Sequence, residues 1–141
     1  MSVSICLNMI VKNEIEVLPR LFFTLRDFID YYVIVDTGST DGTQEFIKSE
    51  MENYGINGEI YEEKWVNFGV NRQQALDKAI GKADYALIID ADEEIRCFNK
   101  SKVKNLTYDC YYIKQYFGSL EYYVRKLIYI RDNSCGWNWH Y

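Results

Sequence analysis

Apolar residues in the first 92 positions alternate between short continuous runs and segments with helical spacing. The continuous runs are rich in β-branched and aromatic residues, which favours strands buried on both faces; they occupy residues 2–11, 31–35, 59–65 and 85–89. In the first segment between them, apolar residues recur every three or four positions, at Leu18, Leu21, Phe22, Leu25 and Phe28. The pattern predicts strand, helix, strand, helix, strand, helix and strand, an order typical of a mainly parallel sheet covered by helices.

Capping and turn residues indicate where the three helices begin and end. The pairs Asn13 with Glu16 and Asp41 with Gln44 have the spacing of capping boxes. A proline that fits best in a first helical turn places the start of the first helix nearer Leu18. The second helix is expected to end before Gly55, and the third, over residues 68–80, to end at Gly81.

The pattern changes after residue 94. A basic, polar loop at residues 99–105 is followed by two aromatic segments, 108–117 and 120–131, joined by the two-residue turn Gly118-Ser119. This order predicts an antiparallel hairpin stabilised by cross-strand aromatic packing. The expected fold class is α/β: a Rossmann-like, mainly parallel sheet with flanking helices, followed by an antiparallel aromatic hairpin. Residues 137–141 end without a polar tail or a closing element, which indicates a domain truncated at its C-terminal end.

Length and composition narrow the class of protein. A chain of 141 residues fits one domain with a real hydrophobic core. Its formal net charge of -5 argues against a nucleic-acid groove or an anionic membrane as the main partner. The four cysteines are far apart in the sequence, which favours neither a zinc site nor a redox motif. Neither a secretory signal nor an apolar run of membrane-spanning length is recognisable, so we expect a soluble, cytoplasmic protein without a transmembrane segment.

Polar residues follow each predicted strand, and in a parallel sheet these positions meet at one edge. They are Lys12-Asn13-Glu14, Asp36-Thr37-Gly38-Ser39, Glu62-Glu63 and Asp90-Ala91-Asp92. Asp90 and Asp92 project to the same side of an extended backbone, and two carboxylates held so close repel each other. A divalent cation would offset this repulsion. A solvated acidic turn is the alternative interpretation of these residues.

Other residues with candidate functions also have ordinary explanations. The turn at residues 38–43 could bind an anionic or polar ligand through backbone N–H groups, or simply join a strand to a helix. Arg72, on the helix before the acidic residues, could clamp a diphosphate or lie in solvent. Three tryptophans could stack on sugars or lie buried, and the lone histidine could be a metal ligand or a base. These residues are Trp65, Trp137, Trp139 and His140.

Taken in order, four segments resemble one enzyme family. They are Met9-Ile10-Val11-Lys12-Asn13-Glu14, then Val33-Ile34-Val35-Asp36-Thr37-Gly38-Ser39-Thr40-Asp41-Gly42-Thr43, then Trp65-Val66-Asn67-Phe68 with Arg72, and Asp90-Ala91-Asp92-Glu93. The set closely resembles the family 2 glycosyltransferases with the GT-A fold. The match covers residues 3–95, and residues 126–139 more weakly. The resemblance implies transfer of a sugar, with inversion, from a nucleotide diphosphate donor to an acceptor hydroxyl.

The resemblance also implies a role for each matching residue. Asp90-Ala91-Asp92 matches the family's D-x-D motif, so Asp92 would bind Mn²⁺ or Mg²⁺, and Asp90 would assist the metal or face the ribose. Arg72 would lie near the base and the diphosphate. The nucleotide-binding positions are matched by Ile10, Asn13, Asp36 and, at the start of the turn, Gly38. Many relatives carry a second aspartate where this chain has Thr37, a departure that bears on the usual contact to a uracil ring. No residue is assigned as the general base.

As a family member, the chain is expected to be a single domain, 1–141. Residues 1–95 would form its nucleotide-sugar-binding half, and residues 96–141 would begin its acceptor-side half, with a further C-terminal domain beyond. A UDP-sugar is the expected donor, while a glycan, a protein and a lipid all remain open as the acceptor. The alternatives are a catalytically silent or hydrolysis-only nucleotide-sugar-binding module and a sugar-nucleotide pyrophosphorylase. A pyrophosphorylase resembles its relatives in a Gly-rich, Arg-containing loop after the first strand, which Lys12-Asn13-Glu14 is not.

Overall fold

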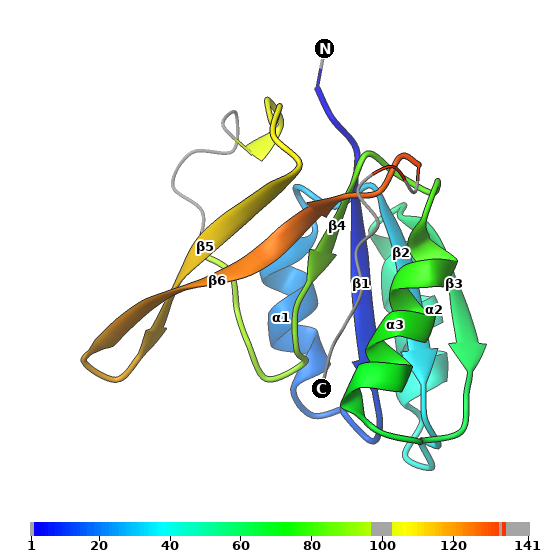
Figure 1. Ribbon diagram of the computed structural model, residues 1–141. Coiled ribbons are helices and arrows are strands. Elements are labelled where there is room, and N and C mark those ends of the chain that lie inside the picture. The colour runs from blue at the N-terminus through cyan, green and yellow to red at the C-terminus, as the bar shows by residue number, and fades with distance from the viewer. Residues whose placement is uncertain (1, 97–102, 133, 135–141) are drawn as a thin grey trace.

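The computed structural model describes residues 2–96, 103–132 and 134, and its centre is a six-stranded sheet in the order β3-β2-β1-β4-β6-β5 (Figure 1). The first four strands pair in parallel and are β1 (Ile5–Val11), β2 (Tyr31–Asp36), β3 (Asn57–Glu62) and β4 (Tyr85–Ile88). The last two, β5 (Cys110–Phe117) and β6 (Leu120–Tyr129), form an antiparallel hairpin. The predicted α/β fold with a C-terminal hairpin is confirmed.

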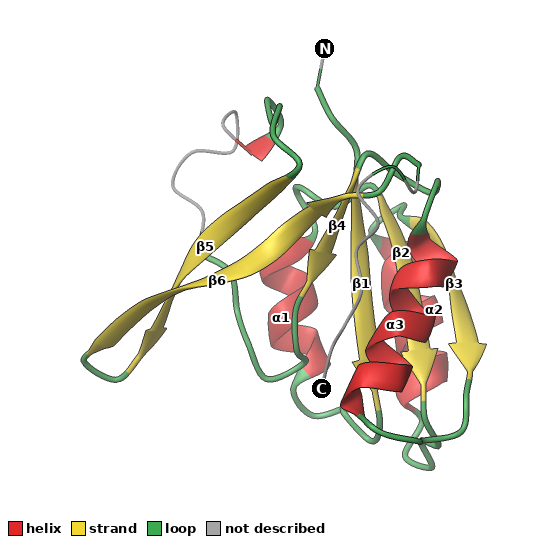
Figure 2. Ribbon diagram, viewed as in Figure 1, coloured by secondary structure: helices red, strands yellow, loops and turns green. Residues whose placement is uncertain are grey.

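Helices cover both faces of the parallel strands, as Figure 2 shows. In that view α3 (Phe68–Ala79) lies in front of the sheet, while α1 (Leu18–Leu25) and α2 (Thr43–Asn53) lie behind it. Alternate residues of β1 enter two separate clusters: Leu7 and its neighbours pack with α1 and α2, whereas Cys6 packs with Leu76 of α3. Burial on both faces explains why β1, β2 and β4 read as continuous apolar runs, whereas the edge strand β3 is only half-buried.

The hairpin extends the same sheet rather than standing apart from it. β6 pairs antiparallel with β4, through Leu127 and Leu87 among others, so the sheet is mixed. Close to β4 the hairpin packs aromatic rings together, with Tyr85 against Tyr111 and Tyr129. Farther out, cross-strand pairs join a cation to a ring. They are Arg125 over Tyr112 and Lys114 over Tyr123. Cross-strand aromatic packing is therefore present, with basic side chains as partners at the outer end.

Two helices have N-caps that differ from the predicted capping boxes. The N-cap of α1 is Val17, without a side-chain hydrogen bond, so Asn13 does not cap that helix. Asn13 has φ 53°, a left-handed conformation that asparagine tolerates better than most residues. The N-cap of α2 is Gly42, again without a side-chain bond, and Gln44 instead donates to Glu62. Gly55 and Gly81 follow helix ends as predicted, with φ 71° and 82°.

The third strand also differs from the prediction, since it ends at Glu62 rather than Trp65. Asn67 is the N-cap of α3, its Oδ1 accepting a hydrogen bond from the Val70 N–H. The buried Asn71 accepts from the Val66 N–H and donates to the Lys64 carbonyl, which takes these residues out of the strand. Within the residues described above, no helix is both long and apolar enough to cross a lipid bilayer.

Candidate active site

The polar residues after β1, β2 and β4 lie at one edge of the sheet. Val11 is paired with Asp36 in the β1·β2 ladder, and Asn8 of β1 is paired with Ile88, the last residue of β4. The three strands therefore deliver their following loops to the same side of the molecule. In Figure 1 these loops lie together at the lower edge of the sheet, beside the start of α3.

The loops after β1 and β2 are fastened to each other by hydrogen bonds. The Asn13 N–H donates to Ser39 Oγ at 2.8 Å, and Asn13 Oδ1 accepts from the Thr40 N–H at 2.7 Å. The Glu14 N–H donates to Thr43 Oγ1 at 3.0 Å. The backbone N–H and the side-chain oxygen of Asn13 thus both form hydrogen bonds with the turn at residues 38–43. Asn13, a predicted nucleoside-pocket residue, shapes the turn that follows β2.

Asp36 carries a buried carboxylate with one oxygen left over. Its exposed fraction is 1%, and its Oδ1 accepts from the N–H groups of Gly38 and Ser39, each at 2.8 Å. Its Oδ2 is buried and has no hydrogen-bond partner within the described part of the chain. Gly38 has φ 122°, which favours glycine, and so allows this tight turn around the carboxylate. Buried polar atoms without a partner are uncommon in folded proteins, which makes Asp36 a candidate ligand contact.

Arg72 is buried against the sheet rather than solvated. It lies on α3 with an exposed fraction of 8%, and its Nη2 donates to Asp90 Oδ1 in an ion pair. Its Nη1 is buried and has no hydrogen-bond partner among the residues that the structure describes. The structure thus brings two predicted site residues, Arg72 and Asp90, into direct contact. The contact itself was not predicted.

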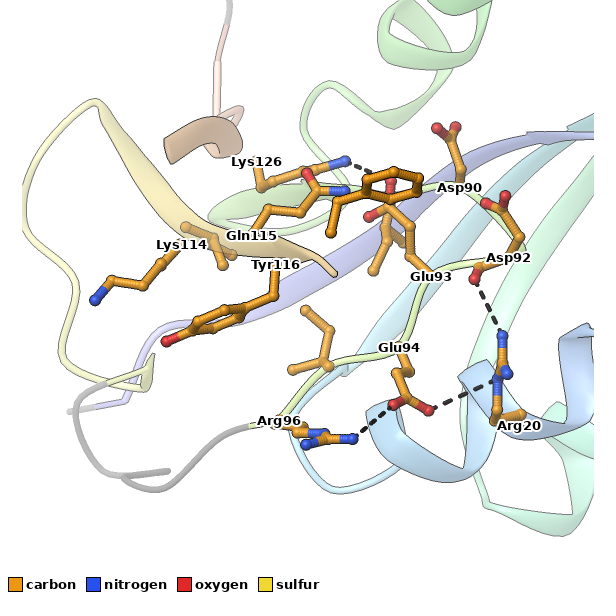
Figure 3. A pocket seen from close by; sticks show the side chains of 14 residues that line it. Arg20, Asp90, Asp92, Glu93, Glu94, Arg96, Lys114, Gln115, Tyr116 and Lys126 are labelled. Carbon is orange, nitrogen blue, oxygen red and sulfur yellow. Dashed lines mark hydrogen bonds and ion pairs between the residues drawn. The ribbon is translucent and has the colours of Figure 1, made fainter. Parts of the chain in front are cut away.

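The acidic residues after β4 form a turn whose side chains spread outwards. Ala91 is 4% exposed and packs in the core, so its neighbours Asp90 and Asp92 both face away from it. Figure 3 shows their carboxylates on the same side of the loop, although residues 91 and 92 form a turn and not the extended backbone that the spacing argument assumed. The Asp92 carbonyl accepts from Arg20 Nη2 at 3.1 Å, which attaches this loop to α1.

Glu14 also lies near this acidic turn, although it was not among the predicted site residues. The pKa of Glu14 is raised, first by burial and then by the negative charges of Asp92 and Asp90. No group of three or more His, Cys, Asp or Glu side chains within residues 2–96, 103–132 and 134 is arranged to hold a metal ion. Two carboxylates still fit Mg²⁺ or Mn²⁺ when substrate phosphates complete the coordination, which is the usual arrangement at phosphate-binding enzymes.

A cleft of about 870 Å³ opens beside the acidic loop. One wall is the loop itself, and the other is the hairpin, which contributes Gln115, Tyr116 and Phe117 from β5 and Lys126 from β6. The sequence did not predict this wall, because no local pattern specifies which strand β6 pairs with. The continuous apolar segment 127–130, buried or half-buried at each position, was the available signal.

The remaining candidates are Ile10 at the carboxyl end of β1, Trp65, and three residues outside the described ones. Trp65 is 44% exposed and meets Phe68 edge to face, with ring centroids 5.1 Å apart, so it is not a core residue. Ile10 is half-buried near the end of β1. Trp137, Trp139 and His140 lie outside the described residues. Cys6 is a buried hydrophobe, and burial raises the pKa of its thiol to about 12.

A mixed sheet with a polar carboxyl edge and a C-terminal hairpin is the arrangement found in GT-A enzymes. The chain belongs to glycosyl transferase family 2, whose family model matches residues 6–96. Over 94 residues it is 37% identical to a TPR repeat-containing protein of Synechococcus elongatus, a match covering 66% of this chain and 21% of the relative. It is 27% identical over 135 residues to the SPbeta prophage-derived glycosyltransferase SunS of Bacillus subtilis, covering 88% of this chain and 31% of that protein.

Solved structures confirm the fold. The TarS 1-349 protein of S. aureus, in complex with UDP-GlcNAc, matches with a TM-score of 0.57 at 24% identity, over 71% of this chain and 29% of that one. The mannosyltransferase PcManGT from Pyrobaculum calidifontis, in complex with GDP-Man and Mn²⁺, matches with a TM-score of 0.57 at 21% identity, over 69% and 30%. The chain spans less than a third of each of these proteins and relatives.

Proposed function

We propose that this chain is the donor-binding part of an inverting glycosyltransferase that takes a sugar from a nucleotide diphosphate, with a UDP-sugar as donor. The observation that carries the proposal is the buried Arg72 guanidinium at the carboxyl edge of the sheet. One of its nitrogens is held by Asp90, and another is buried without a partner in the described chain. A fixed, incompletely satisfied cation in that position suits a diphosphate oxygen.

Each predicted site residue has a defined part in this proposal. Asp92, exposed and aimed away from the core, would ligate Mn²⁺ or Mg²⁺ with Asp90 beside it. The bound cation would offset the negative charge of the departing diphosphate. Asp36 would use its unpartnered Oδ2 to accept a hydrogen bond from the nucleoside. The remaining predicted contacts, near the nucleoside and along the acidic turn, are Ile10, Asn13, Gly38 and Ala91.

The chemistry requires only one covalent exchange. The acceptor oxygen forms a bond to the anomeric carbon while the bond from that carbon to the diphosphate oxygen breaks, and the diphosphate leaves with the electron pair. Arg72 stabilises the charge that develops on this leaving group because it is positioned before the reaction begins. Inversion also needs a base that takes the acceptor proton, and we assign that role to no described residue.

The relatives support the donor class and leave the acceptor open. TarS has been crystallised with UDP and UDP-GlcNAc, and PcManGT with GDP-Man and Mn²⁺. We propose that residues 1–95 are the nucleotide-sugar half of the domain and that residues 96–141 begin the half that binds a glycan, protein or lipid acceptor. We also propose that the protein acts in the cytoplasm together with a further C-terminal domain.

Thermal denaturation with a donor panel tests this proposal. We expect a UDP-sugar with Mn²⁺ to raise Tm, and Asp92→Ala to abolish the Mn²⁺-dependent part of the shift because it removes a carboxylate ligand. Lys114→Ala, an exposed change on the hairpin, is the matched control. A Tm unchanged by every UDP- and GDP-sugar, with or without Mn²⁺, would refute the donor site.

Product analysis then separates the enzyme from its alternatives. Release of UDP that depends on an added acceptor indicates transfer, whereas release without any acceptor indicates hydrolysis. Binding with neither reaction indicates a silent module. Formation of UTP from the sugar nucleotide and pyrophosphate would indicate a pyrophosphorylase.

A further inference from the structure

An ion pair joins the hairpin to the acidic loop. Lys126 lies on β6, and its Nζ is 3.0 Å from Oε1 of Glu93. Both side chains are largely enclosed, with exposed fractions of 13% for Lys126 and 19% for Glu93. Figure 3 shows the Lys126 side chain reaching across from the hairpin toward the loop that also carries Asp90 and Asp92.

Because this ion pair is enclosed, the loss of one partner should cost more free energy than it would at the surface. Removing one partner of an enclosed ion pair leaves a charge without compensation, which is strongly unfavourable, whereas exposed pairs contribute little. The same hairpin supplies a comparison, because Lys114 and Glu121 approach only to 3.7 Å with side chains 41% and 55% exposed. The Lys126 contact holds the Glu93 side chain of the acidic loop, whereas the Lys114 contact lies within the hairpin.

The acidic loop is held from its other side as well. Arg20 of α1 donates to the Asp92 carbonyl and lies 3.7 Å from the Glu94 carboxylate. The loop therefore contacts a helix on one side and a strand on the other, at three successive residues, and the enclosed Lys126–Glu93 pair is the strongest of these contacts. The Asp92 carboxylate takes no part in these contacts.

We propose that Lys126 is a positioning residue for the donor metal: through Glu93 it sets the direction of the loop so that Asp90 and Asp92 present their carboxylates together. In this proposal Lys126 acts through its ion pair with Glu93 and is not itself a ligand of the metal or the nucleotide. The inference rests on the donor site proposed above and adds to it a residue from the hairpin, outside the segment that the family model matches.

Metal affinity is the quantity that tests this role. Mn²⁺ is titrated, with detection by electron paramagnetic resonance, into protein saturated with UDP or with GDP. For Lys126→Met, which keeps the apolar stem and removes the charge, we expect Mn²⁺ to bind about tenfold more weakly, the lower end of the range for direct partners of metal ligands, because Lys126 acts on Asp90 and Asp92 only through Glu93. Lys126→Arg restores most of the affinity, and Lys114→Met is the control with wild-type affinity.

Two further measurements separate positioning from a general loss of structure. Binding of UDP or GDP in the presence of EDTA should be unchanged in Lys126→Met, because the nucleoside side of the site does not depend on this pair. Amide hydrogen exchange at residues 90–94 of the metal-free protein should be faster in Lys126→Met than in Lys114→Met. If Lys126→Met does not fold, the double change Glu93→Gln with Lys126→Met leaves no unpaired charge and should show the same loss of Mn²⁺ affinity.

The outcomes distinguish the two proposals. Mn²⁺ affinity of folded Lys126→Met within twofold of wild type overturns the positioning role alone. Failure of the wild-type protein to bind Mn²⁺ with either nucleotide overturns the donor site and, with it, this inference.

Discussion

Arg72 is the residue whose environment most changes the interpretation of the site. It precedes Ala75, Leu76 and Ala79 of α3 by one and two turns, and all four are buried. A residue at that spacing lies on the same face as the apolar stripe, so its burial follows from helical periodicity. The ion pair with Asp90 does not follow, because it joins residues on two different elements.

Substitution of Arg72 should therefore affect ligand binding more than other changes on the same helix. We expect Arg72→Lys to raise the Kd for UDP at least about tenfold, since a point charge cannot hold Asp90 and a phosphate oxygen together as a planar guanidinium can. The measurement is isothermal titration calorimetry with Mn²⁺ present. Lys78→Met, on the same helix but paired with Glu63 at 3.1 Å, is the control and should bind as wild type. Equal affinity of Arg72→Lys and wild type would contradict the assigned role.

At the scale of elements, the site depends on how loops from neighbouring strands are joined. The order of strands and helices was predictable because each element carries its own periodicity. The hydrogen bonds between Asn13 and the residues Ser39 and Thr40 were not predictable, because residues 26 and 27 positions apart in the sequence share no repeating pattern. The capping-box prediction at Asn13 failed for the same reason, since a residue suited to a helix cap is equally suited to bond another loop.

Asn13 should accordingly contribute to stability as well as to the shape of the site. We expect Asn13→Ala to lower the free energy of unfolding by about 1–2 kcal/mol, through the lost acceptor for the Thr40 N–H and the strain of alanine at positive φ. Asn13→Gly loses the hydrogen bond but not the backbone conformation, so it should cost less. Urea denaturation measures both. Two variants as stable as wild type would show that the loops are held together without this side chain.

At the scale of the whole molecule, one mixed sheet joins the parallel strands β1 to β4 to the antiparallel hairpin of β5 and β6. Asp84 and Arg131 join these parts at the edge opposite the site: Arg131 Nε donates to Asp84 Oδ1 at 2.5 Å, and the Ser4 N–H donates to Asp84 Oδ2 at 2.8 Å. Burial opposes ionisation of Asp84, but the bonds from Ser4 and Arg131 outweigh it, so its pKa is lowered.

This lowered pKa makes a prediction about acid stability. A carboxyl group with a folded-state pKa below its unfolded value of 3.8 stabilises the protein above that pH and loses this contribution as the pH falls through the folded-state pKa. We expect wild type to be more stable than Asp84→Asn at pH 6, and the difference to shrink on going to pH 3. The comparison uses urea denaturation at both pH values. A difference that stays constant or grows in acid would contradict the assignment.

More of the fold than of the candidate site could therefore be predicted from the sequence. Strand ends rich in polar residues located the functional edge, because a parallel topology fixes where those ends meet. What the sequence could not supply were contacts between distant segments: Arg72 with Asp90, Lys126 with Glu93, and β6 with β4. Each depends on packing of the complete sheet, and no local preference of the residues involved encodes it.

The Lys126 contact with Glu93 has a consequence in the reverse direction. Coupling free energies are reciprocal. If the hairpin stabilises the metal-binding arrangement of the acidic loop, binding of donor and metal at that loop should stabilise the hairpin by the same free energy. Binding of donor and metal at the acidic loop would then slow hydrogen exchange in β5 and β6. If the proposed donor site is correct, the hairpin wall of the cleft would be more firmly held with the donor bound than without it, which would favour binding of the donor before the acceptor.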